Sequence, residues 1–142
     1  LPEYYPTRTE MAMMQAHAAE MADRIGSEAI LIEYGSGNSR KTRALIAALN
    51  PLAYVPVDIA AEQLRASSES LAGAFPALRV IAVCADYSRP LALPGIDAAG
   101  ARRRVIYFPG STIGNFTVPE ALAFLSRARE LAGAGGAMLV GV

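Results

Sequence analysis

Short apolar runs alternate along this chain with longer stretches in which apolar residues recur at helical spacing. The short runs cover residues 29–34, 53–57, 78–84, 105–108 and 137–142. Their near-continuous apolarity is typical of strands that are buried on both faces of a parallel sheet. We therefore predict five parallel strands, with one objection at Pro56, because a proline cannot donate a hydrogen bond within a sheet.

The longer stretches predict four helices between and around these strands. They cover residues 7–25, 38–49, 60–73 and 119–132. Thr7 or Thr9 can cap the first helix, with Glu10 as an acidic residue in its first turn. Gly26 is expected to end that helix. A loop rich in proline and glycine is expected over residues 88–101.

Strands that alternate with helices in this way indicate an α/β fold. Right-handed crossovers, together with a glycine turn after the first strand, favour a Rossmann-like sheet with the strand order 3-2-1-4-5. Helices are expected on both faces of this sheet, after an N-terminal helix. In such sheets ligands bind beyond the carboxyl ends of the strands, near the switch point between strands 1 and 4.

Composition narrows the class of protein. The 142 residues fit one domain, and an apolar fraction of 53% with 18% charged residues excludes a disordered chain. Thirteen basic and 13 acidic residues leave no net charge, which argues against nucleic acid as a partner. No apolar run approaches the length of about 18 residues that a membrane span needs. The single cysteine, Cys84, excludes an internal disulfide, and we expect a cytoplasmic protein.

The turn Gly35-Ser36-Gly37 joins the first strand to the next helix. Glycine permits a tight turn and close approach of a ligand to the backbone, and the helix start that follows favours an anion. Arg40 occupies the position at which a dinucleotide fingerprint requires a small residue, which disfavours an NAD(P) oxidoreductase. Taken alone, the glycine pair is equally compatible with a plain tight turn.

Acidic residues follow the second and third predicted strands. Asp58 lies close to the distance of about 20 residues beyond the glycine turn at which an acid binds ribose hydroxyls, although it can also cap a helix. Asp86, followed by Tyr87, can accept a hydrogen bond from an adenine amine or form an Asx turn. Without a pyrophosphate fingerprint, S-adenosylmethionine (SAM) fits this set best. Lys41 can pair with its carboxylate, or be an ordinary solvated charge.

Two further segments are unusual for plain scaffolding. Tyr5 stands beside a proline just before the first helix, and Asn115 ends the polar segment 109–115 that follows the fourth strand. Asn115 can donate and accept hydrogen bonds, as a zwitterionic amino acid requires. The alternative roles are packing of the N-terminal arm for Tyr5 and a turn cap for Asn115.

Three sequence blocks now carry a resemblance. They are Leu-Pro-Glu-Tyr-Tyr-Pro-Thr-Arg-Thr-Glu (1–10), Glu-Tyr-Gly-Ser-Gly-Asn-Ser (33–39) and Gly-Ser-Thr-Ile-Gly-Asn-Phe (110–116). In order and spacing the chain resembles, over essentially its whole length, the histidine-specific SAM-dependent methyltransferases of ergothioneine biosynthesis. The first and third blocks are specific to that family, whereas the glycine loop is shared with methyltransferases at large.

The resemblance implies a class I methyltransferase core that trimethylates the α-amino group of L-histidine to hercynine, with SAM as cofactor and S-adenosylhomocysteine as product. By motif position, the residues implied to contact SAM are Gly35, Gly37, Lys41, Asp58, Asp86 and Tyr87. Those implied to contact histidine are Tyr5, Gly110 and Asn115. Tyr87 replaces the phenylalanine expected at its position, a mild change if the ring only packs.

The resemblance also implies a second, acceptor-binding domain beyond residue 142, so that residues 1–142 would be the SAM-binding domain of a longer protein. We expect that protein to be a monomer. We predict no metal site. Tyr5 is the catalytic candidate, as the residue that orients the attacking amine. The motifs contain no obvious general base. Two other functions stay open: methylation of another amino acid or small amine, and binding of an adenosine ligand without chemistry.

Overall fold

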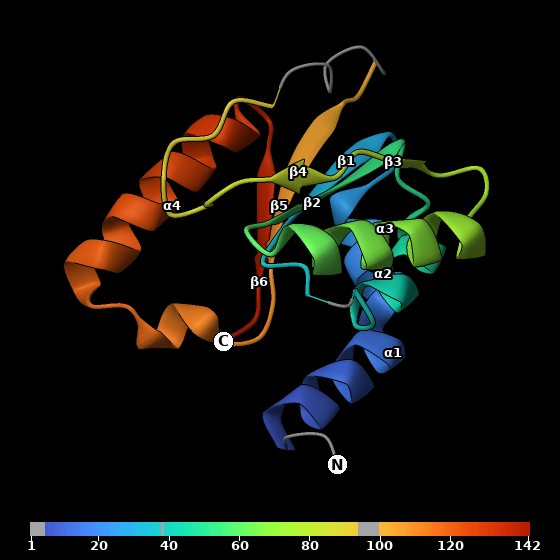
Figure 1. Cartoon of the computed structure of the whole chain (residues 1–142), viewed down its shortest axis with the longest axis horizontal. Helices are drawn as coiled ribbons and strands as arrows, with labels where there is room; N and C mark the ends of the chain where they lie inside the picture. The colour runs from blue at the N-terminus through green and yellow to red at the C-terminus, as the bar shows by residue number, and fades with distance from the viewer. Residues whose placement is uncertain (1–4, 38, 94–99) are drawn as a thin grey trace.

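One parallel sheet forms the centre of this protein (Figure 1). The computed structural model describes residues 5–37, 39–93 and 100–142, with side chains from residue 8 onward. Its strands are β1 (Ala29–Tyr34), β2 (Ala53–Asp58), β3 (Arg79–Val80), β4 (Val83–Cys84), β5 (Arg103–Phe108) and β6 (Ala137–Val140). The order is β3-β2-β1-β5-β6, with β4 also paired to β2. Because β3 and β4 lie in the predicted third strand, this confirms the order 3-2-1-4-5.

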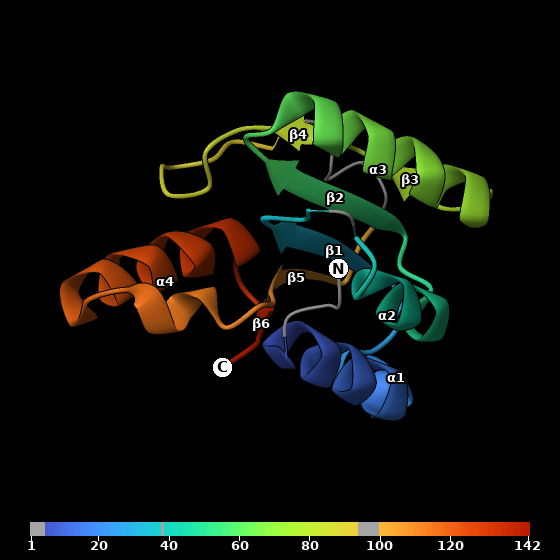
Figure 2. The same cartoon turned by 60° about the horizontal axis from the view of Figure 1, so that its bottom comes forward.

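Helices cover both faces of the sheet, as predicted (Figure 2). They are α1 (Tyr5–Ile25), α2 (Thr42–Leu49), α3 (Ala61–Ala74) and α4 (Val118–Ala132), with a short 3-10 helix η2 (Thr112–Asn115) before α4. The first three pack on one face, and α4 packs on the other. The start of α4 is fixed by a capping box in which Thr117 and Glu120 exchange hydrogen bonds.

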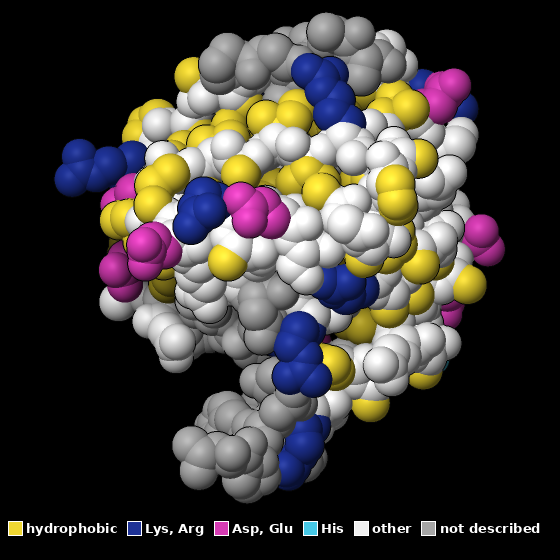
Figure 3. Space-filling view, turned by 45° about the vertical axis from the view of Figure 1, so that its right-hand side comes forward, with side chains coloured by type: hydrophobic (Ala, Val, Ile, Leu, Met, Phe, Trp, Pro, Cys, Tyr) yellow, Lys and Arg dark blue, Asp and Glu magenta, His cyan; other side chains and the backbone are white. Residues whose placement is uncertain are grey.

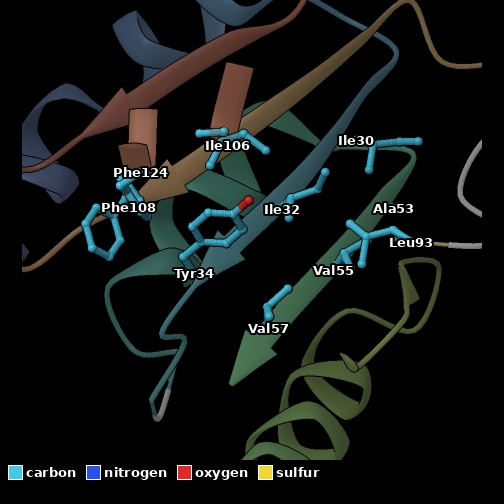
Figure 4. Close-up of a cluster of buried hydrophobic side chains, with 11 residues drawn as sticks. Ile30, Ile32, Tyr34, Ala53, Val55, Val57, Leu93, Ile106, Phe108 and Phe124 are labelled. Atoms are coloured by element: carbon cyan, nitrogen blue, oxygen red, sulfur yellow. The ribbon is translucent and has the colours of Figure 1, made fainter. Parts of the chain in front are cut away.

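Strand β1 is buried along its whole length and contributes to two cores. Ile30, Ile32 and Tyr34 point to the α4 side, and Figure 4 shows Tyr34 close to Phe108 and Ile30 toward the other end of this cluster. Leu31 points to the opposite face and joins the core beneath α1, α2 and α3. This alternation is the period of two that a strand imposes on its side chains. The carboxyl end of β1 is thereby fixed from both sides.

Two predicted helix starts were wrong. Helix α1 begins at Tyr5 rather than residue 7, because a proline is well tolerated in the first turn of a helix. Thr9 and Glu10 therefore lie inside the helix, beyond its first turn. Helix α2 begins at Thr42 rather than residue 38, and Lys41 precedes it. The backbone before it is used in turns: Ser39 has φ +60°, and the N–H of Thr42 donates to the Ser39 carbonyl at 3.2 Å.

The third predicted strand, 78–84, was wrong as a continuous element. It is divided into β3 and β4, which pair with β2 at Ala53–Tyr54 and at Val57–Asp58 respectively. The gap lies opposite Pro56. The carbonyls of Tyr54 and Asp58 accept hydrogen bonds from this outer strand, so Pro56 faces the same side but has no N–H to donate. The break between β3 and β4 therefore lies where Pro56 lacks an N–H donor.

Strand β5 begins two residues before the predicted strand 105–108, at Arg103. Arg103 and Arg104 are adjacent in the strand, so their side chains leave opposite faces of the sheet. Arg103 Nη1 donates to the carbonyl of Ile25 at 2.9 Å, and Arg104 Nη1 donates to that of Leu131 at 3.0 Å. Each arginine thus satisfies a carbonyl at the C-terminal end of a helix, where positive charge is favourable.

On the face shown in Figure 3, basic and acidic side chains are interspersed over the surface. Within the described ranges, none of the helices combines the length and the apolar character needed to cross a bilayer.

Candidate functional site

The glycine turn lies at the carboxyl end of β1 and is tied to the end of β2. Gly35 and Gly37 have φ values of +67° and +54°, which confirms the predicted tight turn. The N–H of Gly37 donates to Asp58 Oδ2 at 3.2 Å, while Asp58 Oδ1 accepts from the N–H of Ala60 at 3.0 Å. Asp58 therefore holds the turn and the chain before α3 together. The side chain of Asp58 is partly exposed, which leaves it accessible to a ligand.

Beneath the turn lies a buried carboxyl group that the sequence analysis did not single out. Glu33 is 2% exposed and accepts hydrogen bonds from Thr42 Oγ1 and, at 2.6 Å, from the hydroxyl of Tyr54. Burial raises the pKa of the Glu33 carboxyl to about 7, although these hydrogen bonds and the charge of Lys41 act in the opposite direction. The Tyr54 hydroxyl also lies 3.2 Å from Ser39 Oγ. This network supports the loop that precedes α2.

A cavity of about 230 Å³ opens above this network, at the carboxyl ends of β1 and β5. The predicted residues that line it are Gly35, Gly37, Lys41 and Gly110. Ser36 also lines it, and its buried Oγ has no hydrogen-bond partner within the described part of the chain. An unpartnered hydroxyl beside a lysine fits a ligand that brings a negatively charged oxygen, such as the carboxylate of SAM.

Glu10 connects three segments at the edge of this cavity. Its carboxylate accepts from the N–H of Gly110, at 2.8 and 2.9 Å to the two oxygens, and lies 3.6 Å from Lys41 Nζ. Gly110 has φ +89°, and a β-carbon there would lie 3.6 Å from Lys41 Nζ. The positive φ would strain any side chain at position 110, and its β-carbon would be in van der Waals contact with the lysine. From the sequence, Glu10 was predicted only as an acidic residue in the first turn of a helix.

Asp86 and Tyr87 follow β4 at the same edge of the sheet. Asp86 Oδ1 accepts from the N–H and the hydroxyl of Ser88, and these hydrogen bonds lower the pKa of Asp86. An Asx turn, the alternative role for Asp86, is therefore present. The ring of Tyr87 stacks on Tyr34 with 5.3 Å between centroids. A β-carbon on Gly35 would lie 3.6 Å from Tyr87 Cε2, so the ring packs against the glycine turn.

The two remaining candidates, Asn115 and Tyr5, are not found among the described residues that line this cavity. Asn115 is exposed at the end of η2 and is not among the residues that line the cavity. Tyr5 is the first residue of α1, but its side chain lies outside the described residues. The structure therefore brings the SAM candidates, and Gly110 among the histidine candidates, to one edge of the sheet, and the binding roles of all of these residues stay predictions.

A larger cavity of about 500 Å³ lies elsewhere, between α4 and the segment after β4. It contains none of the predicted site residues. Arg104, near the start of β5, is among its lining residues, so it lies toward the amino ends of the strands. Ligands of open α/β sheets bind at the opposite ends. The smaller cavity is therefore the better candidate.

The strand order, the glycine turn and the acid at the end of β2 define a Rossmann-like methyltransferase fold. Among solved structures, the glycopeptide N-methyltransferase MtfA complexed with S-adenosyl-L-homocysteine matches with a TM-score of 0.66 and 23% identity, over 89% of this chain and 47% of that one. The family model described as histidine-specific methyltransferase, SAM-dependent, matches residues 1–142. The chain belongs to this family, which confirms the resemblance.

Two relatives with curated names match along nearly the whole chain. Histidine N-alpha-methyltransferase of Mycolicibacterium smegmatis is 36% identical over 99% of this chain and 44% of its own length. Ergothioneine biosynthesis protein 1 of Neurospora crassa is 32% identical over all of this chain and 17% of its own length. The chain thus spans less than half the length of these relatives.

Proposed function

We propose that the full-length protein carrying this chain is a SAM-dependent N-methyltransferase that trimethylates the α-amino group of L-histidine to hercynine, within ergothioneine biosynthesis. The observation that carries this proposal is the match of the histidine-specific family model over all 142 residues. Residues 1–142 would be the SAM-binding domain, and a second domain would complete the acceptor site. The protein would act on this small amino acid as a cytoplasmic monomer.

The residues present fit SAM. Lys41 and the unpartnered Ser36 hydroxyl would hold its amino-acid end, Asp58 would accept from its ribose hydroxyls, and the Asp86–Tyr87 segment would meet the adenine. SAM supplies an electrophilic methyl group on a sulfonium. This chain's residues bind and orient, because holding the reacting groups in line accounts for up to about 7–11 kcal/mol of the barrier. Tyr5, Gly110 and Asn115 would position the histidine amine, whose proton would leave to water or to the second domain.

Calorimetric titration of the full-length protein with SAM, S-adenosylhomocysteine and NAD tests the cofactor. SAM and S-adenosylhomocysteine are expected to bind and NAD is not. An activity screen with histidine and its mono- and dimethyl forms, set beside other amino acids, then tests the acceptor. Turnover of all three histidine forms supports the proposal. Binding of SAM without turnover of histidine would favour another acceptor or an adenosine-binding module.

Replacing Tyr5 with phenylalanine in the full-length protein is expected to raise the KM for histidine about tenfold while the Kd for SAM stays within twofold. The hydroxyl would contribute one hydrogen bond to the amine, worth about 1.5 kcal/mol. Steady-state kinetics and titration with SAM measure the two constants. Equal losses in both would contradict a role for Tyr5 at the acceptor.

A further inference from the structure

Glu10 is a buried carboxylate that the family motifs did not assign to the site. It lies in α1, about one and a half helical turns after Tyr5. The residue is 9% exposed, and its side chain reaches the loop that follows β5 and the residue that precedes α2. Three segments that are distant in sequence therefore meet at one side chain.

A carboxylate at such a position is stable only with partners, because burying an unpaired charge is costly. Among the residues that the structure describes, Glu10 has two of them. The Gly110 N–H donates to both carboxylate oxygens, and Lys41 Nζ lies 3.6 Å from Oε1, with the lysine side chain 22% exposed. Both partners line the candidate cavity.

The absence of a side chain at Gly141 makes room for this arrangement. A β-carbon on Gly141 would lie 3.0 Å from Glu10 Oε2 and 3.1 Å from the Gly110 nitrogen. Gly141 itself is held by its N–H, which donates to the Phe108 carbonyl at 2.9 Å. The notch between the ends of β5 and β6 is thus shaped to admit one carboxylate.

We propose that Glu10 is a positioning residue that joins the two halves of the reaction site. Its carboxylate holds the Lys41 ammonium toward the cavity and fixes the Gly110 backbone, from which the chain runs through η2 to Asn115. The contact with Lys41 would favour binding of SAM, and the contact with Gly110 would favour binding of the acceptor. This inference rests on the proposed function in so far as Lys41 binds SAM.

The test separates these contacts by comparing two substitutions in the full-length protein. Glu10→Gln keeps an oxygen for the Gly110 N–H but loses the charge that attracts Lys41. It is expected to raise the Kd for SAM about fivefold and leave the KM for histidine within twofold. Glu10→Ala loses both contacts, and is expected to raise both constants and to accelerate amide hydrogen exchange at Gly110 at least tenfold.

Gly141→Ala is a second route to the same result, because it keeps the charge but places a β-carbon 3.0 Å from Glu10 Oε2, so that the carboxylate must shift away from the Gly110 N–H. It is expected to accelerate exchange at Gly110 as Glu10→Ala does, and this keeps the inference testable if Glu10→Ala does not fold. Glu20→Gln, on the exposed side of the same helix, is the matched control and should change neither constant.

The inference is overturned if Glu10→Ala lowers only the melting temperature and leaves Gly110 exchange and both constants unchanged. If the natural protein binds no SAM, the proposed function fails, and with it the role of Glu10 toward SAM. Amide hydrogen exchange at Gly110 needs no ligand, so it still shows whether Glu10 holds the loop that follows β5. Faster exchange in both Glu10→Ala and Gly141→Ala supports that hold, and unchanged exchange refutes it.

Discussion

Replacing Asp58 with alanine is expected to weaken SAM binding by roughly 100-fold or more in the full-length protein. In the proposed complex the carboxylate accepts from both ribose hydroxyls, and a hydrogen bond to a charged group contributes about 1.5–3 kcal/mol. The substitution also removes the acceptor of the Gly37 N–H, so the glycine turn loses its tie to β2. Calorimetric titration with SAM measures the loss.

Two other substitutions make the Asp58 result specific. Glu69→Gln removes an acidic charge from the exposed side of α3 and should leave the Kd for SAM unchanged. Asp86→Asn is expected to raise it only a few fold, because Asp86 Oδ1 already accepts two hydrogen bonds from Ser88. A Kd within threefold of the natural protein after Asp58→Ala would remove the ribose role of Asp58.

Replacing Glu33 with glutamine is expected to abolish a loss of stability that the natural chain shows as the pH rises. Burial raises the Glu33 pKa from 4.5 to about 7, so the folded state binds its proton more tightly than the unfolded state does. The stabilisation is complete below pH 4.5 and is lost as the pH rises through 7. At about 1.4 kcal/mol per pKa unit, the free energy of unfolding falls by about 3 kcal/mol.

Urea unfolding at pH 5, 6, 7 and 8 measures this contribution. Glutamine keeps a carbonyl oxygen for the hydroxyls of Thr42 and Tyr54 but has no charge to bury. Between pH 5 and 8 the free energy of unfolding should fall less for this variant than for the natural chain, by about 2.5 kcal/mol. Glu20→Gln, at an exposed position, should keep the natural profile. Parallel profiles for the natural chain and Glu33→Gln would show that Glu33 does not titrate in this range.

The strands were predictable because burial on both faces leaves an unbroken apolar run, and β1 has the predicted bounds, Ala29–Tyr34. The start of α2 was not predictable in the same way. The backbone between Ser39 and Thr42 forms a turn, and helix propensity does not register the left-handed conformation of Ser39. Pro56 did give a local signal, and the break in the outer strand lies opposite it.

For the site, residues that follow a strand end were predictable, since parallel strands bring their carboxyl ends to one edge. Glu33 had a signal that was not used, as the one charged residue in an otherwise apolar strand. Glu10 had none, because its partner Gly110 lies 100 positions away and no local pattern links them. The orphaned hydroxyl of Ser36 likewise emerges only when its surroundings are known.

The division of the outer strand into β3 and β4 makes this edge of the sheet more susceptible to proteolysis. Two pairings of two residues each hold this margin of the sheet, so it opens at a smaller free energy than β1 does. Arg79 is exposed at the start of this outer strand, where trypsin can cleave once the strand detaches. Binding of a nucleoside to the neighbouring Asp86–Tyr87 segment would stabilise the pairing of this outer strand. Protection of the chain from tryptic cleavage therefore measures whether a nucleoside occupies the adenine part of the site.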